Sequence, residues 1–140
     1  MDAFDADVLI YAAAPAHPLG NRVLSLFSES GRGEREFAGL GSTLLIPETL
    51  IRPTRHGDSG ERLALASLLV RLDLRPSDMA IADLAVALGA GYGLKTVDAT
   101  HLATAVNAGA DRFITNNRRD FPKSITEVDV TYPEDLTEPE

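Results

Sequence analysis

The stretch FDADVLIYAA, residues 4–13, decides how the chain folds, because it sets two carboxylates at the mouth of an apolar run. We predict a short strand that ends near Asp5 and turns directly into a helix over residues 8–14, where the following proline ends it. Asp7 is suited to cap that helix, or to support a site by hydrogen bonding. Asp5 interrupts a core strand without an obvious partner in the sequence. We therefore expect Asp5 to be a functional acid.

Composition predicts a single folded domain over residues 1–140. The chain is 44% hydrophobic and 24% charged, which is typical of a globular protein with a packed core. It has no cysteine, which excludes disulfides and thiolate metal sites. Its longest apolar runs fall far below the ~20 residues that span a membrane, and its acidic N-terminus is unlike a secretory signal. We therefore expect a cytoplasmic protein with no membrane segment.

The rest of the chain alternates helix-like and strand-like segments. In chain order we predict a helix from residue 19 into the loop SESGRG, a strand over 43–46, a helix entered at Pro47 or Glu48, a helix within 61–74, a helix over 77–89 capped by Ser77, a helix from Asp98 to Gly109, and strands over 112–115 and 127–133. About residues 134–140 form an acidic tail, which we expect to be frayed. This alternation favours a three-layer α/β/α sandwich with a mostly parallel central sheet.

Polar residues stand where the predicted strands end and the helices begin. Asp5 ends one strand, and Asn116 and Asn117 follow another. Glu48 and Asp98 each open a helix. Taken alone, Asp98 is explained equally well as an N-cap, and Glu48 as an acid that favours the helix macrodipole. Because ligands of parallel sheets bind beyond the carboxyl ends of the strands, we expect these residues to meet at one edge.

The acids at this edge suit a hard divalent cation. Carboxylates that converge at a buried edge repel one another unless a proton or a cation neutralises them. Mg²⁺ and Mn²⁺ prefer oxygen ligands, and few carboxylates suffice when phosphate supplies the rest. Asp5, Glu48 and Asp98 match that donor set. Such an ion activates water for attack on a phosphodiester, so the acids predict metal-dependent nuclease chemistry.

The positive charge of the chain is concentrated in two short clusters. The formal net charge is −8, which opposes non-specific binding to nucleic acid over most of the surface. RPTRHG carries Arg52 and Arg55, and NNRRD carries Arg118 and Arg119. These clusters are either RNA phosphate contacts or solvated loops. The three histidines show no ligand spacing, so we predict no acid–base role for histidine.

Four short motifs follow one another along nearly the whole chain. They are Asp5, Ala6 and Asp7 before an apolar run, Glu48 in LLIPETL, Asp98 at the head of DATHLATAVNAGADRFIT, and FITNNRRDF. In this order they resemble the PIN-domain family, and more narrowly the VapC-type toxins of bacterial toxin–antitoxin pairs. The last motif departs from the family pattern, since Asn117 stands where many members carry Asp.

The resemblance implies a Mg²⁺- or Mn²⁺-dependent endoribonuclease that is inhibited by a cognate antitoxin and commonly forms a homodimer. It implies that Asp5, Glu48 and Asp98 are catalytic, and that Asp5 and Asp98 hold the metal. The residues that would support the site are Asp7, Thr115 and Asn117. An amide oxygen brings no charge, so we expect one well-held ion instead of two.

Two alternatives stay open. The missing fourth carboxylate favours a PIN-like domain with weakened or lost catalysis that acts as an RNA- or protein-binding module. The other alternative is an acidic α/β phosphatase that uses its first Asp as the nucleophile. Such enzymes usually also need a lysine near the phosphate, and the chain offers only Lys95 and Lys123.

Overall fold

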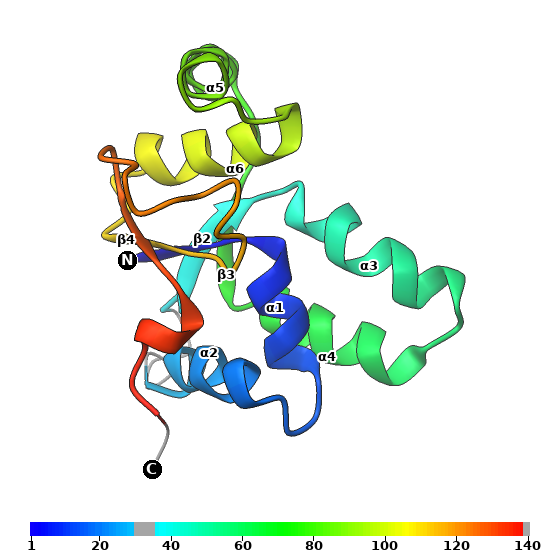
Figure 1. Cartoon of the computed structure of the whole chain (residues 1–140). Coiled ribbons are helices and arrows are strands. Elements are labelled where there is room, and N and C mark those ends of the chain that lie inside the picture. The colour runs from blue at the N-terminus through cyan, green and yellow to red at the C-terminus, as the bar shows by residue number, and fades with distance from the viewer. Residues whose placement is uncertain (30–35, 139–140) are drawn as a thin grey trace.

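The computed structural model of the chain describes residues 1–29 and 36–138 (Figure 1). In chain order its elements are β1 (Asp2–Phe4), α1 (Ala6–Ala13), α2 (Pro18–Glu29), β2 (Gly39–Ser42), α3 (Leu45–Arg55), α4 (Ser59–Leu69), β3 (Leu72–Arg75), α5 (Met79–Tyr92), α6 (Thr96–Asn107), β4 (Arg112–Ile114), β5 (Asp129–Thr131) and the short 3₁₀ helix η1 (Pro133–Asp135). The strands form one sheet between two layers of helices, which confirms the predicted α/β/α fold.

The strand order in the sheet is β3-β2-β1-β4-β5, and every pair of neighbours is parallel. The chain therefore starts at the centre, builds outward to β3, and then returns to the other side of β1. Phe4 of β1 pairs with Ile114 of β4, so the two strands end at the same level. Between them the order of the chain reverses, and such a switch point leaves a crevice beyond the carboxyl ends of the strands.

Two hydrophobic clusters hold the layers together. Phe4, Leu9 and Leu65 belong to the cluster between the sheet and helices α1, α2 and α4. Leu102 and Phe113 belong to the cluster on the opposite face, beneath α5 and α6. Figure 1 shows these two groups of helices on opposite sides of the sheet. The faces alternate along each strand because successive side chains of a strand point in opposite directions.

The predicted strand over residues 43–46 is wrong, because β2 lies at Gly39–Ser42 and α3 already begins at Leu45. The strand was overlooked because it reads as a glycine-rich loop. A Cβ atom on Gly39 would lie 2.5 Å from the Asp2 carbonyl oxygen, and one on Gly41 would lie 2.4 Å from a methyl carbon of Leu45. Close packing against the Asp2 backbone therefore requires glycine at position 39, whereas a side chain at position 41 would displace the end of the Leu45 side chain.

The helix of about three turns predicted within residues 61–74 is α4, which runs from Ser59 to Leu69, but the strand β3 that follows at Leu72 was not predicted. Leu72 and Leu74 alternate with Asp73 and Arg75, which is a strand pattern joined directly to the apolar helix. The two charged residues of this edge strand, Asp73 and Arg75, form an ion pair of 3.1 Å. With only four residues, β3 was too short for its strand pattern to be told apart from the helix pattern of α4 in the sequence.

The ends of α5 differ from the prediction at both positions. Asp78, and not Ser77, is the N-cap, and its carboxylate accepts a hydrogen bond of 2.9 Å from the Ile81 backbone N–H. The helix continues past Gly89 and ends at Gly93, whose φ of 69° is the left-handed conformation that glycine adopts at little cost. A Cβ atom on Gly89 would lie 3.3 Å from the Cβ of Ala99, so Gly89 lets α5 approach α6.

The C-terminal segment is packed through Leu136, so the prediction of a frayed tail is wrong for residues 134–136. Arg22 of α2 donates hydrogen bonds of 2.9 and 3.0 Å to the carbonyls of Glu134 and Leu136. Leu136 is buried in the cluster that lies under α2. Residues 139–140 lie outside the described chain.

Among the described residues, no single helix has the length and apolar character to cross a membrane. Helices α5 and α6 meet these two criteria only as a pair, and they are bent by 115° at the break between them.

Candidate active site

Asp5 lies at the switch point of the sheet, directly after β1. It is the N-cap of α1, and its carboxylate accepts a hydrogen bond of 2.8 Å from the Ala6 N–H. The hydroxyl of Thr115, directly after β4, donates a bond of 2.7 Å to the other carboxylate oxygen. The side chain is buried, and burial raises the pKa of Asp5 even though His101 and these hydrogen bonds act to lower it. Two neighbouring strand ends thus hold one desolvated acid.

Asp7 does not cap α1, and that prediction is wrong, because Asp5 takes the cap position. One Asp7 oxygen accepts a hydrogen bond of 3.0 Å from the Asn116 N–H. The other oxygen, Oδ1, is buried and has no hydrogen-bond partner among the described residues. Burial first, and then the charge of Asp5, raises the pKa of Asp7 to about 7. Asp7 therefore presents an unsatisfied oxygen beside Asp5.

Asp98 is also free of a capping role. The N-cap of α6 is Lys95, and Asp98 stands in the first turn of the helix. Within the described chain, the Asp98 carboxylate forms neither a hydrogen bond nor an ion pair. Its pKa is raised by burial first and then by the charges of Asp5 and Asp120. The helix thus directs an uncommitted carboxylate toward Asp5.

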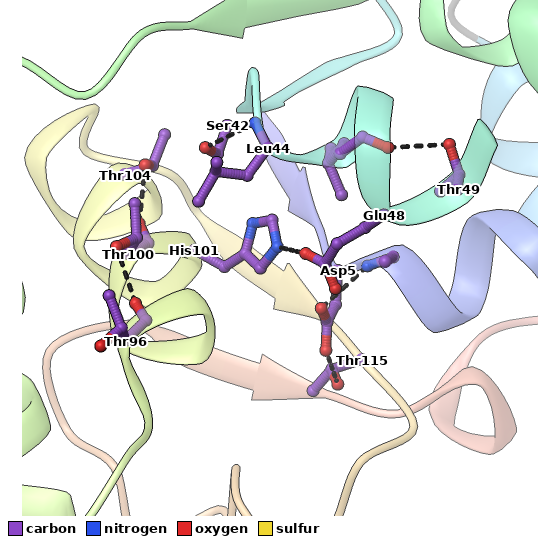
Figure 2. A network of polar contacts seen from close by, with 12 residues as sticks. Asp5, Ser42, Leu44, Glu48, Thr49, Thr96, Thr100, His101, Thr104 and Thr115 are labelled. Carbon is purple, nitrogen blue, oxygen red and sulfur yellow. Dashed lines mark hydrogen bonds and ion pairs between the residues drawn. The ribbon is translucent and has the colours of Figure 1, made fainter. Parts of the chain in front are cut away.

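Glu48 joins the site through a partner that the sequence did not predict. In the first turn of α3, its carboxylate forms a close ion pair with Nε2 of His101 on α6 (Figure 2). Only 1% of the His101 side chain is exposed, compared with 34% for Glu48. Burial lowers the pKa of His101, but Glu48, Asp5 and Asp98 together outweigh burial and raise it. The prediction that histidine has no acid–base role stays untested, but the histidine spacing did not indicate this contact.

A weak signal for His101 exists in the sequence. Asp98 and His101 are three residues apart, and that spacing places two side chains on the same face of a helix. The partner Glu48 lies 53 residues away in the chain, so ligand spacing between histidines could not reveal the pair.

Asn117 is held in a local turn. Its amide Nδ2 donates a hydrogen bond of 2.9 Å to the Asp120 carboxylate, and its Oδ1 accepts one of 3.2 Å from the Asp120 N–H. The Asn117 backbone N–H donates to the Thr115 hydroxyl oxygen over 3.1 Å. Asn117 therefore orders the loop after β4 and brings Asp120 toward the acids, since Asp120 contributes to the raised pKa of Asp98.

The four arginines that we predict as RNA contacts fall into two groups, one engaged by an acid of this chain and the other exposed. Arg118 forms an ion pair of 2.7 Å with Glu134 and lies 4.5 Å from the centre of the Tyr132 ring, so the C-terminal segment occupies it. Arg52 and Arg55 are exposed in the last turn of α3, and Arg119 is exposed in the loop after β4. Arg52 and Arg55 follow Glu48 by four and seven residues, which sets all three on one face of the helix.

The donor set fits a hard divalent cation that keeps most of its water. The described residues include no group of three or more His, Asp or Glu side chains already placed to hold a metal. Mg²⁺, however, needs only one or two carboxylates besides water and phosphate oxygens. Asp5 and Asp98 each carry a raised pKa, and Asp7 Oδ1 lacks a partner. A cation would relieve this accumulation of negative charge.

Comparisons with known proteins agree with this architecture. Residues 3–124 match the sequence model of the PIN domain. No curated protein sequence matches the chain significantly. A chain of a toxin–antitoxin complex from Klebsiella pneumoniae is similar in structure, with a TM-score of 0.66 and 22% identity over 95% of this chain and 98% of that one. VapBC2 from Rickettsia felis, bound to a DNA fragment from its promoter, aligns with a TM-score of 0.70 and 14% identity over 94% and 97% of the respective chains.

Proposed function

Because the chain belongs to the PIN-domain family, as its motifs predict, we propose that it is a divalent-metal-dependent endoribonuclease and the toxin of a VapBC-type toxin–antitoxin pair. The observation that carries the proposal is the accumulation of acids at the switch point of the sheet, where none of the three forms an ion pair with a described residue. Asp5, Asp7 and Asp98 come from two distant segments, and the pKa of each is raised by burial. A structural role would give these acids cationic partners.

The side chains divide the work of the proposed enzyme. Asp5 and Asp98 hold the ion, Mg²⁺ or Mn²⁺, and Glu48 is the third catalytic acid. When bound, the ion supplies a water of lowered pKa and neutralises charge on the phosphate. Thr115 and the Ala6 N–H fix the Asp5 carboxylate in one orientation, so its geometry does not depend on the ion. Asp7 and Asn117 support the loop after β4.

Substrate and partner follow from the charges. We propose that Arg52, Arg55 and Arg119 hold RNA phosphates beside the acids, while Arg118 is engaged by Glu134. An acidic site suits a basic antitoxin segment, whose arginine would reach the carboxylates in place of the ion. Both solved structures described above are toxin–antitoxin assemblies, which supports an antitoxin as the partner. We further propose a cytoplasmic protein that forms a homodimer.

Cleavage of a fluorescently labelled RNA by the purified protein tests the proposal. We expect cleavage in Mg²⁺ or Mn²⁺ and none in excess EDTA. Asp98→Asn should abolish cleavage without lowering the Tm in EDTA, because it removes repulsion from a carboxylate that has no structural bond. Asp83→Asn, an exposed acid of α5, is the matched control and should cleave normally. Full activity of Asp98→Asn, or activity in EDTA, would refute the mechanism.

A second candidate function is a PIN-like module that binds RNA or protein with weakened or lost catalysis. It is favoured by Asn117, whose amide is committed to Asp120 and adds no fourth carboxylate to the site. RNA binding that is retained without any cleavage in either metal would favour this module over the nuclease.

A further inference from the structure

His101 is the buried link between the two helices that border the acids. Its ring lies on α6 one turn after Asp98, and its Nε2 contacts the Glu48 carboxylate of α3. Figure 2 shows the ring pointing from α6 toward Glu48 and Asp5. The ring therefore connects Glu48 of α3 to the region of Asp5, which follows β1, and of Asp98 on α6.

Without that contact, Glu48 would have no fixed position. Its side chain is partly exposed in the first turn of an outer helix, and within the described chain its carboxylate has no bond other than the one to His101. A free glutamate side chain samples many rotamers, and fixing it costs conformational entropy. A histidine ring has only two side-chain torsions, and here its burial already restricts them. The buried His101 ring thus fixes the position of the Glu48 side chain.

Packing alone does not explain a histidine at this position. The Nδ1 atom of His101 is buried and has no hydrogen-bond partner among the described residues. A leucine would fill similar space without leaving a buried polar atom unsatisfied, which is unfavourable. The contact of Nε2 with Glu48 is the polar interaction that requires an imidazole.

We propose that His101 is a positioning residue that holds one oxygen of Glu48, so that the other oxygen faces the site of Asp5 and Asp98. This inference rests on the proposed metal-dependent function. Helix α6 then contributes two residues to the site, Asp98 through its carboxylate and His101 through its ring. Glu48 then acts as a fixed third acid instead of a mobile surface charge.

The test measures Mg²⁺ and Mn²⁺ binding by calorimetry without RNA, together with kcat and KM for RNA cleavage. We expect His101→Leu to weaken metal binding by about 10-fold or more, as is typical when a residue that orients a metal ligand is lost. Glu48→Ala should have a similar effect, and the double variant should be no worse than either single one, because both changes remove the same contact. His56→Leu is the matched control, since His56 is exposed at the end of α3.

Two further variants separate positioning from packing. The amide of His101→Gln can still donate to Glu48 and should restore most of the metal affinity. The shorter amide of His101→Asn cannot reach Glu48 and should behave like His101→Leu, and it replaces that variant if the leucine protein does not fold. The Tm in EDTA reports on folding for each protein.

The outcomes distinguish this inference from the proposed function. If Asn, Gln and Leu at position 101 change the Tm in EDTA but leave metal affinity and kcat at wild-type values, His101 is only a core residue, and the nuclease proposal stands. If the wild-type protein neither binds the ions nor cleaves RNA, the proposed function fails, and the inference fails with it.

Discussion

Two acids that are separated by a single residue, Asp5 and Asp7, have different environments in this protein. Asp5 is fixed by the Ala6 N–H and the Thr115 hydroxyl. Asp7 is bonded through one oxygen only, and its other oxygen is buried without a partner in the described chain. Neither environment supplies a cation in direct contact. At the scale of the residue, the folded state therefore holds negative charge that is costly when the acids are ionised.

This charge makes the stability of the metal-free protein depend on pH. The pKa of Asp7 rises from 3.8 to about 7 on folding, because of burial and then the charge of Asp5. Between these values the folded state binds more protons than the unfolded state, so the free energy of unfolding falls as the pH rises. Asp5 and Asp98 shift in the same direction. We expect the Tm of the wild-type protein in EDTA to fall as the pH rises over this range. The Tm of Asp7→Asn should fall less steeply.

Thermal unfolding in EDTA over a series of pH values measures this effect, with Asp83→Asn as the control acid. An Asp7→Asn protein whose Tm follows the wild-type pH profile would mean that the Asp7 carboxylate is not desolvated by folding.

A second prediction concerns Asn117. In Asn117→Asp the new carboxylate would stand against Asp120, at a distance of 2.9 Å between the present amide nitrogen and the carboxylate oxygen. The variant should have a lower Tm in EDTA, since a hydrogen bond becomes a repulsion, and a larger rise of the Tm on addition of Mg²⁺. Thermal unfolding with and without Mg²⁺ checks both. An unchanged Mg²⁺-induced rise would show that residue 117 does not influence the ion.

At the scale of the elements, the helices and the strands β1, β4 and β5 were predictable, whereas β2 and β3 were not. The helices and the first strand follow from apolar periodicity and from Pro15, but β2 is built on Gly39 and Gly41, whose value lies in close packing that only the folded sheet reveals. The places of Asp5, Glu48 and Asp98 beside a strand end or in the first turn of a helix were predictable because each belongs to a local motif, and their catalytic role stays a prediction. His101 was not predictable, because its role depends on a partner in another element.

The glycine in β2 gives a prediction at this scale. Gly39→Ala should lower the free energy of unfolding by about 1–3 kcal/mol, since its methyl group would lie against the rigid Asp2 carbonyl and the Phe4 ring. Gly91→Ala is the matched control within α5. A Cβ atom there meets nothing within 4 Å, and alanine favours a helix interior by about 1 kcal/mol over glycine. Urea denaturation measures both, and equal effects would contradict the packing of β2.

At the scale of the whole molecule, a chain of net charge −8 must bind RNA through a few local cations. Arg52 is exposed on the helix that carries Glu48, whereas Arg118 is already paired with Glu134. In an Asp98→Asn background, which leaves the RNA intact, Arg52→Ala should reduce the slope of log affinity against log salt by about 1. Arg118→Ala should reduce it less. Equal salt slopes with and without Arg52→Ala would mean that Arg52 is a solvated surface residue that does not contact RNA phosphate.

The central place of β1 in the sheet has a consequence during synthesis. The first strand to leave the ribosome is completed on one side by β2 and on the other only by β4, near the end of the chain. Asp5 therefore lacks its hydrogen bond from Thr115 in any nascent fragment that stops short of β4, even in one that already contains Glu48 and Asp98. The site that we propose for RNA cleavage is therefore complete only when β4 and Thr115 have been translated.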